Sequence, residues 1–195
     1  MDAFLISTGI VALAEMGDKT QLLALLLAVR FRGHAWPIVL GILVATLANH
    51  GLAGALGAWL MQWMGSGNED LLRWVIGGSF LAMAVWILVP DKLEGVDLPQ
   101  QARVSFFGVF ATTVMLFFIA EMADKTQIAT VMLAARFENA WLAVVAGTTL
   151  GMMLANAPVV WLGERITRRL PLKLIRMVSA LLFAVLGIVA LWPQA

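Results

Sequence analysis

The sequence predicts an all-α membrane protein in which six transmembrane helices form two three-helix repeats of inverted topology. Composition is the first observation: 62% of the 195 residues are hydrophobic, 13% are charged, and the mean hydropathy is +0.91. Soluble domains contain about a quarter charged residues, so this chain has too few polar side chains to cover a soluble surface. The other two observations are six long apolar segments and a polar heptapeptide that occurs twice.

Each apolar segment is long enough to cross the hydrocarbon core of a bilayer, which takes about 20 helical residues. The segments run approximately over residues 3–29, 35–62, 72–90, 104–135, 140–163 and 172–193. The residues before the first segment include acidic Asp2 and no basic residue, which favours a helix of the mature protein over a signal peptide.

Short polar stretches divide these segments. RFRGHAWP separates the first from the second, GSGNED the second from the third, RFENAW the fourth from the fifth, and GERITRRLPLK the fifth from the sixth. The only substantial loop is PDKLEGVDLPQQAR, between the third and the fourth. We therefore expect a first repeat at residues 1–90, a cytoplasmic linker at 91–103 and a second repeat at 104–195.

The repeat is visible in the polar residues. EMGDKTQ at residues 15–21 matches EMADKTQ at residues 121–127 at six of seven positions, and LAN at 47–49 has a counterpart at 154–156. Each half thus carries three segments, with the motif and the Asn at equivalent places. Because three is odd, the second half enters the membrane from the opposite side. Many secondary transporters are built from such inverted repeats and bind substrate at the repeat interface near the bilayer midplane.

The two heptapeptides predict one functional site. A charged side chain within a bilayer costs several kcal/mol, so such residues normally face the bundle interior and serve function. In a continuous helix Glu15, Asp18 and Lys19 would share an arc of about 100°, as would their counterparts in the second half. Two such arcs can face each other and bring together Glu15, Asp18, Glu121 and Asp124. The other members of the site would be Lys19, Thr20, Gln21, Asn49, Lys125, Thr126, Gln127 and Asn156.

Carboxylate and amide oxygens suit the hard cations Mg²⁺, Ca²⁺ and Mn²⁺. The chain has no cysteine, so thiolate sites are excluded. His34 falls in a loop, whereas His50 follows Asn49 and has Ala157 as its counterpart, so we favour a structural or hydrogen-bonding role for His50 over a ligand role. Four carboxylates and two lysines carry a net charge of −2 when all are ionised, which one divalent cation or bound protons would neutralise.

Simpler explanations exist for some of these residues. Glu15 with Lys19, and Glu121 with Lys125, have the i,i+4 spacing of purely structural ion pairs. Duplication of the whole heptapeptide favours function over that alternative. The small residues of GLAGALG and GTTLG predict close helix packing rather than ligand binding.

The double motif resembles the family of small cation/proton exchangers that contains the bacterial MneA manganese exporters and the Golgi Gdt-type calcium and manganese transporters. Its signature is Glu-x-Gly-Asp-Lys/Arg-Thr/Ser, once in each half, and the resemblance covers essentially the whole chain. It implies secondary-active export of Mn²⁺ from the cytoplasm, with protons as counter-ion and no resident cofactor. The four motif carboxylates would be the metal ligands. Ala123 departs from the signature glycine that Gly17 keeps, so the second half should be stiffer if that glycine lets the helix break.

Other functions remain open at this stage. The nearest alternative is a Ca²⁺/H⁺ antiporter, or one that carries both Ca²⁺ and Mn²⁺, because both ions accept carboxylate oxygens. An exporter of amino acids or organic cations is less favoured, since it would need a larger, partly apolar cavity. No zinc-protease motif or nucleophile–base pairing is present, so an enzyme is not expected, nor is a nucleic-acid partner. The oligomeric state is left open.

The basic residues predict the orientation, because cytoplasmic loops are enriched in Lys and Arg. The predicted outer side carries two, Arg73 and Arg136. The predicted cytoplasmic side carries nine: Arg30, Arg32, Lys92, Arg103, Arg165, Arg168, Arg169, Lys173 and Arg176. We therefore expect a multi-pass protein of the inner (plasma) membrane, with both termini outside the cytoplasm.

This orientation can be tested with a fluorescent reporter that matures only in the cytoplasm. Fused to either terminus it should stay dark, because both ends are placed outside by the distribution of basic residues. The same reporter inserted in the linker at residues 91–103 is the control and should fluoresce. A bright fusion at either terminus would contradict the orientation.

Overall fold

The computed structural model describes residues 1–64, 69–89, 105–122, 124–162 and 171–192, and every regular element in these ranges is helical. The elements are α1 (Asp2–Glu15), α2 (Lys19–Arg30), α3 (Ala35–Met64), α4 (Glu69–Ile87), α5 (Phe106–Glu121), α6 (Lys125–Arg136), η1 (Glu138–Ala140), α7 (Trp141–Leu162) and α9 (Leu172–Leu191). The prediction of an all-α protein is confirmed. The predicted linker at 91–103 lies outside the described residues.

Several of these helices can cross a membrane. α3, α4, α7 and α9 are each long and apolar enough, and α5 with α6 passes the same test as one span bent by 71°. The described residues thus contain four candidate spans, or five with the bent pair. α1 and α2 occupy the predicted span 3–29 and are divided at residues 16–18. A multi-span helical protein is confirmed, while the count of six spans stays a prediction.

The first motif lies at a helix break, so the predicted continuous helical arc is wrong. α1 ends at Glu15, and Met16 turns out of the helix with φ −66° and ψ 115°. Gly17 takes a positive φ of 80°, and Asp18 is the N-cap of α2. Glycine adopts this left-handed conformation without the penalty of a Cβ, and Asp is a favoured N-cap residue. The sequence Gly-Asp therefore favours the end of one helix and the start of the next.

The second motif breaks at the same place. α5 ends at Glu121, Met122 has φ −64° and ψ 124°, and Asp124 is the N-cap of α6. The N-cap dihedrals nearly coincide in the two motifs, at φ −78° and ψ 167° for Asp18 and φ −79° and ψ 166° for Asp124. Ala123 itself lies outside the described residues. The helices end and begin at equivalent residues in both motifs, and the stiffer second half expected from Ala123 stays a prediction.

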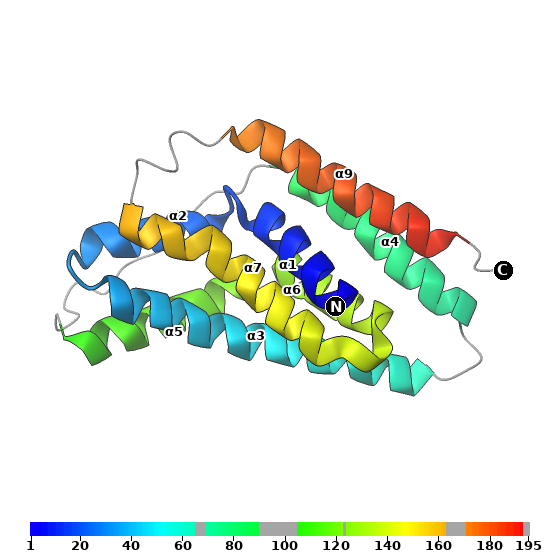
Figure 1. Cartoon of the computed structure of the whole chain (residues 1–195), viewed down its shortest axis with the longest axis horizontal. Coiled ribbons are helices and arrows are strands. Elements are labelled where there is room, and N and C mark those ends of the chain that lie inside the picture. The colour runs from blue at the N-terminus through cyan, green and yellow to red at the C-terminus, as the bar shows by residue number, and fades with distance from the viewer. Residues whose placement is uncertain (65–68, 90–104, 123, 163–170, 193–195) are drawn as a thin grey trace.

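The two halves pack crosswise. α1 lies along α7, α3 lies along α5, and α4 lies along α9, as Figure 1 shows for α4 and α9. Gly41 of α3 approaches Thr113 of α5, and Gly147 of α7 approaches Ser7 of α1. At the offset of 106 residues, Gly41 corresponds to Gly147 and Ser7 corresponds to Thr113. The second contact is therefore the counterpart of the first, with the two halves exchanged. This pairing agrees with two repeats related by a two-fold axis, and the inverted topology remains a prediction.

Two clusters of buried apolar side chains form the core. One is formed mainly by α1, α4, α6 and α9, and the other mainly by α2, α3 and α5. Large apolar side chains such as Trp63, Phe107 and Leu181 remain exposed on the outer faces of the helices. A surface of this kind suits lipid, and among the described residues the buried charged side chains all belong to the two motifs.

Glycines set the distance between α3 and α6, as the small-residue pattern predicted. A Cβ added at Gly57 would meet the Val131 carbonyl oxygen and lie 2.9 Å from the Ala134 Cβ. We expect Gly57→Ala to lower the free energy of unfolding by about 1–3 kcal/mol, because overpacking forces the helices apart. Thermal unfolding of the detergent-solubilised protein measures this loss.

Gly51→Ala is the matched control, because a Cβ there meets nothing within 4 Å. This variant should be as stable as the parent or slightly more stable, since Ala favours the helix by about 0.5–1 kcal/mol over Gly. Equal stability of the two variants would contradict close packing at Gly57.

Candidate cation site

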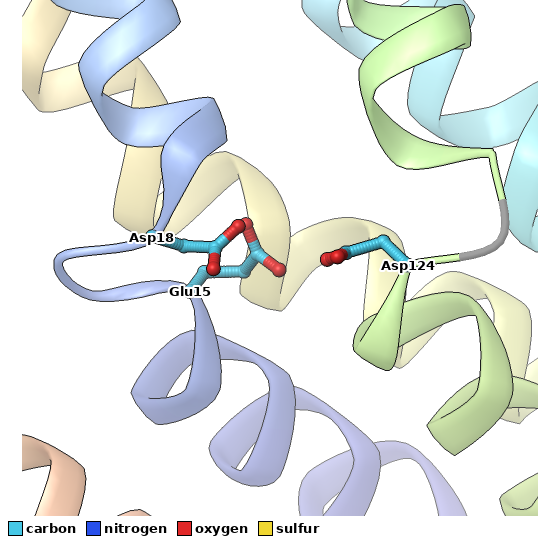
Figure 2. A group of neighbouring side chains, drawn as sticks. All are labelled: Glu15, Asp18 and Asp124. Carbon is cyan, nitrogen blue, oxygen red and sulfur yellow. The ribbon is translucent and has the colours of Figure 1, made fainter. Parts of the chain in front are cut away.

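The two motifs meet in the interior, where two helices end and two begin. Glu15 and Glu121 are the last residues of α1 and α5, and Asp18 and Asp124 immediately precede α2 and α6. All four carboxylate side chains are buried. Figure 2 shows the carboxylates of Glu15 and Asp18, from the first motif, pointing toward that of Asp124 from the second. The structure thus brings the two motifs together, as the sequence predicted.

Three of the four predicted ligands form a compact group. Glu15, Asp18 and Asp124 each place one carboxylate oxygen so that the three oxygens lie within 4.8 Å of one another. Metal–oxygen distances of about 2.0–2.6 Å allow ligands on opposite sides of one ion to be up to about 5 Å apart. One cation can therefore bind all three. Glu121 is equally buried but is not part of this group.

The lysines join the two motifs. Lys19 Nζ lies 2.8 Å from Asp124 Oδ1, and Lys125 Nζ pairs with Asp18 Oδ1. Each ion pair thus connects one half of the chain to the other, which the i,i+4 alternative does not provide. The expected i,i+4 pairs do not form because the helix is broken within each motif, and i,i+4 spacing brings side chains together only along a continuous helix. Lys125 is only 4% exposed, whereas Lys19 is 28% exposed.

The threonines orient the glutamates in the same way in both motifs. Thr20 Oγ1 donates a hydrogen bond of 2.6 Å to Glu15 Oε2, and Thr126 Oγ1 donates one of 3.1 Å to Glu121 Oε2. Each bond fixes one carboxylate oxygen. The other oxygen of each glutamate, Oε1, is buried and has no hydrogen-bond partner among the described residues.

The glutamines have roles that differ from the predicted one. Gln21 accepts a hydrogen bond of 2.9 Å from the Gly17 amide and donates one of 3.0 Å to the Ala155 carbonyl of α7. Gln21 therefore holds the helix break against the second half. Gln127 is only half-buried and lines an open groove of about 250 Å³ between α3 and α6.

The two asparagines, which were predicted to belong to the site, each keep a side-chain oxygen that could bind a cation. Asn49 Nδ2 donates to the Phe118 carbonyl of α5 at 3.1 Å, and Asn156 Nδ2 donates to the Met152 carbonyl within α7 at 3.1 Å. Their Oδ1 atoms are buried without a hydrogen-bond partner in the described part of the chain. Asn49 thus reaches the end of the helix that carries Glu121, while its oxygen remains available.

These contacts leave a set of buried oxygens with unused lone pairs. The set comprises Glu15 Oε1, Glu121 Oε1, Asp124 Oδ2, Asn49 Oδ1 and Asn156 Oδ1. A buried acceptor without a partner costs about 1–3 kcal/mol. With two lysines against four carboxylates, the site carries −2 when all groups are ionised. A charge of −2 and oxygen ligands of this kind suit one hard divalent cation.

Sequence reasoning missed several polar groups. Thr46 of α3 and Thr149 of α7 are buried, and their hydroxyls have no hydrogen-bond partner within the described ranges. The expected hydrogen-bonding role of His50 is likewise not seen there, since neither ring nitrogen has a partner. The only sign of these buried polar groups in the sequence is that each is a polar residue within an apolar segment.

The sequence matches one protein family and several known proteins. The family described as divalent cation/proton antiporter GDT1 matches residues 3–95 and 109–195. The chain is 48% identical over 188 residues to a Vibrio cholerae protein named "Putative manganese exporter", covering 96% of this chain and 90% of that protein. It is 29% identical over 206 residues to a GDT1-like protein of Synechocystis, covering 100% and 98% of the two chains. It is also 27% identical over 204 residues to GDT1-like protein 3 of rice, covering 93% and 71%. No solved structure matches the chain.

The crossed ion pairs predict unequal effects of removing the two lysines. Lys125→Met should lower the free energy of unfolding by about 3–5 kcal/mol, because it removes the opposite charge that pairs with the buried carboxylate of Asp18. Lys19→Met should cost less, because its pair is more exposed. Thermal unfolding in detergent compares the two variants directly.

A double substitution identifies the partner. Asp18→Asn should restore more of the stability lost by Lys125→Met than of that lost by Lys19→Met, because Asp18 pairs directly with Lys125 and coupling is largest between residues in contact. Greater recovery in the Lys19→Met background, or equal losses in the two single variants, would contradict the crossed pairing.

Proposed function

We propose, on the premise that this chain belongs to the GDT1 family of divalent cation/proton antiporters, that it exports Mn²⁺ from the cytoplasm in exchange for protons. The family match spans both halves and confirms the resemblance drawn from the motifs. It also confirms the expected class, a cation transporter rather than an enzyme. The choice of Mn²⁺ is supported by the name of the relative that is 48% identical.

The compact group of buried carboxylates carries the proposal. Glu15, Asp18 and Asp124 offer oxygen ligands to one ion. The buried amide oxygens of Asn49 and Asn156, which have no hydrogen-bond partner among the described residues, are candidates for further neutral donors. Oxygen ligands of this kind favour Mg²⁺, Ca²⁺ and Mn²⁺ over thiophilic ions. Mg²⁺ usually retains several waters rather than entering a dedicated protein site, which leaves Mn²⁺ and Ca²⁺ as the cations to compare.

The helix ends contribute to cation binding as well. The last carbonyl groups of α1 and α5 have no partner within their helices and carry partial negative charge. Both helices end at the glutamates of the site, so this negative end is directed toward the cation. Asp18 and Asp124 lie instead at the N-termini of α2 and α6, where the partial positive charge of the helix end stabilises a carboxylate. Broken helices supply substrate ligands in this way in other secondary transporters.

Competition for the same oxygens couples the cation to protons. The site has a net charge of −2 when all its groups are ionised, and burial makes an uncompensated charge costly. One divalent cation neutralises it, and so do two protons on the carboxylates. If only the neutralised site changes its access from one side of the membrane to the other, each cation released outside is replaced by protons that return inward. The two crossed lysines reduce the charge of the site from −4 to −2, which a single divalent cation neutralises.

Transport in proteoliposomes tests the proposal, with Mn²⁺, Ca²⁺ and Mg²⁺ offered alone and in competition. Asp18→Asn and Asp124→Asn should reduce Mn²⁺ flux to the level of empty liposomes, because each removes a charged ligand with little change in shape. Asp70→Asn is the matched control and should transport normally, since Asp70 is 84% exposed and pairs with Arg73 on α4. Normal flux in either site variant would refute the proposed site, and Ca²⁺ outcompeting Mn²⁺ would make Ca²⁺ the substrate.

The same liposomes test the proton coupling. A proton gradient directed against the Mn²⁺ flux should accelerate transport, and a protonophore should abolish the acceleration. Because a membrane potential also acts on an unequal exchange of charge, the measurement is made with the potential clamped by K⁺ and valinomycin. Mn²⁺ flux that ignores the gradient would leave the cation site intact but refute the exchange for protons.

A further inference from the structure

Two helices, α4 and α9, pack on each other so closely that they form one unit. A Cβ added at Gly77 would lie 3.0 Å from the Gly187 carbonyl oxygen, and one at Gly187 would lie 2.9 Å from the Gly77 carbonyl oxygen. The rings of Phe80 and Phe183 add a contact with centroids 6.0 Å apart. Small residues allow this close approach, and close packing resists sliding of one helix on the other. The α4–α9 pair (Figure 1) is therefore a rigid unit of the fold.

The other six long helices obey a two-fold relation between the halves. At the offset of 106 residues, α1 corresponds to α5, α2 to α6, α3 to α7 and α4 to α9. α1 packs on α7 as α5 packs on α3, and α1 meets α6 as α5 meets α2. α2 likewise meets α7 as α6 meets α3. These six helices thus pack in counterpart pairs.

The α4–α9 pair breaks this relation. α4 packs on α6 and α9 packs on α1, and all four helices contribute to the same apolar cluster. The counterpart contacts would join α9 to α2 and α4 to α5, but the described helices show no comparable packing at either place. The other apolar cluster contains α2 and α5 and no described residue of α4 or α9. The pair therefore covers one of two equivalent faces of the bundle.

The equivalent face that the pair leaves uncovered is also apolar. Ala135 of α6 is 3% exposed, whereas its counterpart on α2, Val29, is 53% exposed. Ala14 of α1 is buried, whereas its counterpart on α5, Ala120, is half-buried. The apolar face on α2 and α5 thus corresponds to the face on α6 and α1 that the pair covers.

The exposure of the two lysines of the site follows the same asymmetry. Lys125 begins α6, on which α4 packs, and it is 4% exposed. Lys19 begins α2, on which neither helix of the pair packs comparably, and it is 28% exposed. The site is therefore more closed on the side of the α4–α9 pair and more open on the equivalent side without it.

We propose that the α4–α9 pair is the moving body of the transporter. Packed on α1 and α6, as in the structure, it closes the side of Lys125; packed on α5 and α2, it closes the side of Lys19. The other six helices hold the cation site while the pair moves. This inference rests on the proposed function and on the inverted repeat, because only inverted halves turn this exchange into a change of access across the membrane. Rocking of one rigid unit against another is a common means of alternating access.

Two counterpart distances test the movement. The chain has no cysteine, so two introduced cysteines carry the only spin labels. Leu71→Cys with Arg136→Cys reports the packing of α4 on α6, and Met177→Cys with Arg30→Cys reports the approach of α9 to α2. The second pair of positions is the first at the offset of 106 residues, and all four side chains are exposed.

Pulsed electron–electron double resonance in nanodiscs measures both distances without metal, at high and at low pH. The fraction of molecules with the shorter distance should fall in one label pair when it rises in the other, because one body cannot pack on both faces. Val85→Cys with Val178→Cys lies within the α4–α9 pair and should give one constant distance. A single unchanged distance in both reporting pairs, or distances that change in the same direction, would overturn the inference.

A cross-link gives a functional readout in proteoliposomes. A bis-maleimide matched to the shorter measured distance, joining Leu71→Cys to Arg136→Cys, should reduce Mn²⁺ flux to the level of empty liposomes. The same reagent between Val85→Cys and Val178→Cys is the matched control and should leave the flux unchanged, because both ends move together. Normal flux in the first cross-linked variant would overturn the moving pair while the cation site stands. Absence of Mn²⁺ flux in the parent protein would instead refute the proposed function, and this inference with it.

Discussion

A charge buried in an apolar bundle needs an opposite charge within a few ångströms, and this requirement ties the two halves of the chain together. Asp18 pairs with Lys125, and Asp124 pairs with Lys19, so each motif is neutralised in part by the other. Breaking a buried pair by removing one partner costs about 3–5 kcal/mol, which is a large fraction of the stability of an ordinary domain. Neither half can bury its own motif at that cost. The crosswise packing of α1 on α7 and of α3 on α5 brings the motifs close enough to satisfy both.

The helix breaks serve the same requirement. A continuous helix would bond its own carbonyl groups and direct the motif residues along a single face. The break instead places a glutamate at the end of one helix and an aspartate at the start of the next, so both carboxylates reach the same point from different directions (Figure 2). Thr20 and Gln21 then fix this arrangement, one through Glu15 and the other through the Gly17 amide. The polar residues of the heptapeptide thus divide between holding the break and lining the site.

Much of this could be predicted from the sequence, because composition and duplication are properties of the chain alone. The apolar segments predicted helices, and the repeated motif predicted that Asp18 and Asp124 would meet. The helical arc was wrong because spacing arguments assume a continuous helix, and a glycine followed by an N-cap Asp is only a local signal against one. That signal is absent where Ala123 replaces the glycine. The burial of His50 could not be predicted either, since it depends on how α3 packs against α6 and not on its immediate neighbours.

The two crossed ion pairs are equivalent in the sequence but not in their surroundings. Lys19 is 28% exposed, whereas Lys125 is 4% exposed. Perfect two-fold symmetry would make these values equal, so the structure shows the site more open on the side of Lys19. An inverted-repeat transporter reaches its opposite state when its halves exchange conformations. If the halves of this chain are inverted, as the motifs predict, that exchange would bury Lys19 and expose Lys125. The same two ion pairs would then hold the site together in both states, and the change of access would need no new ligands.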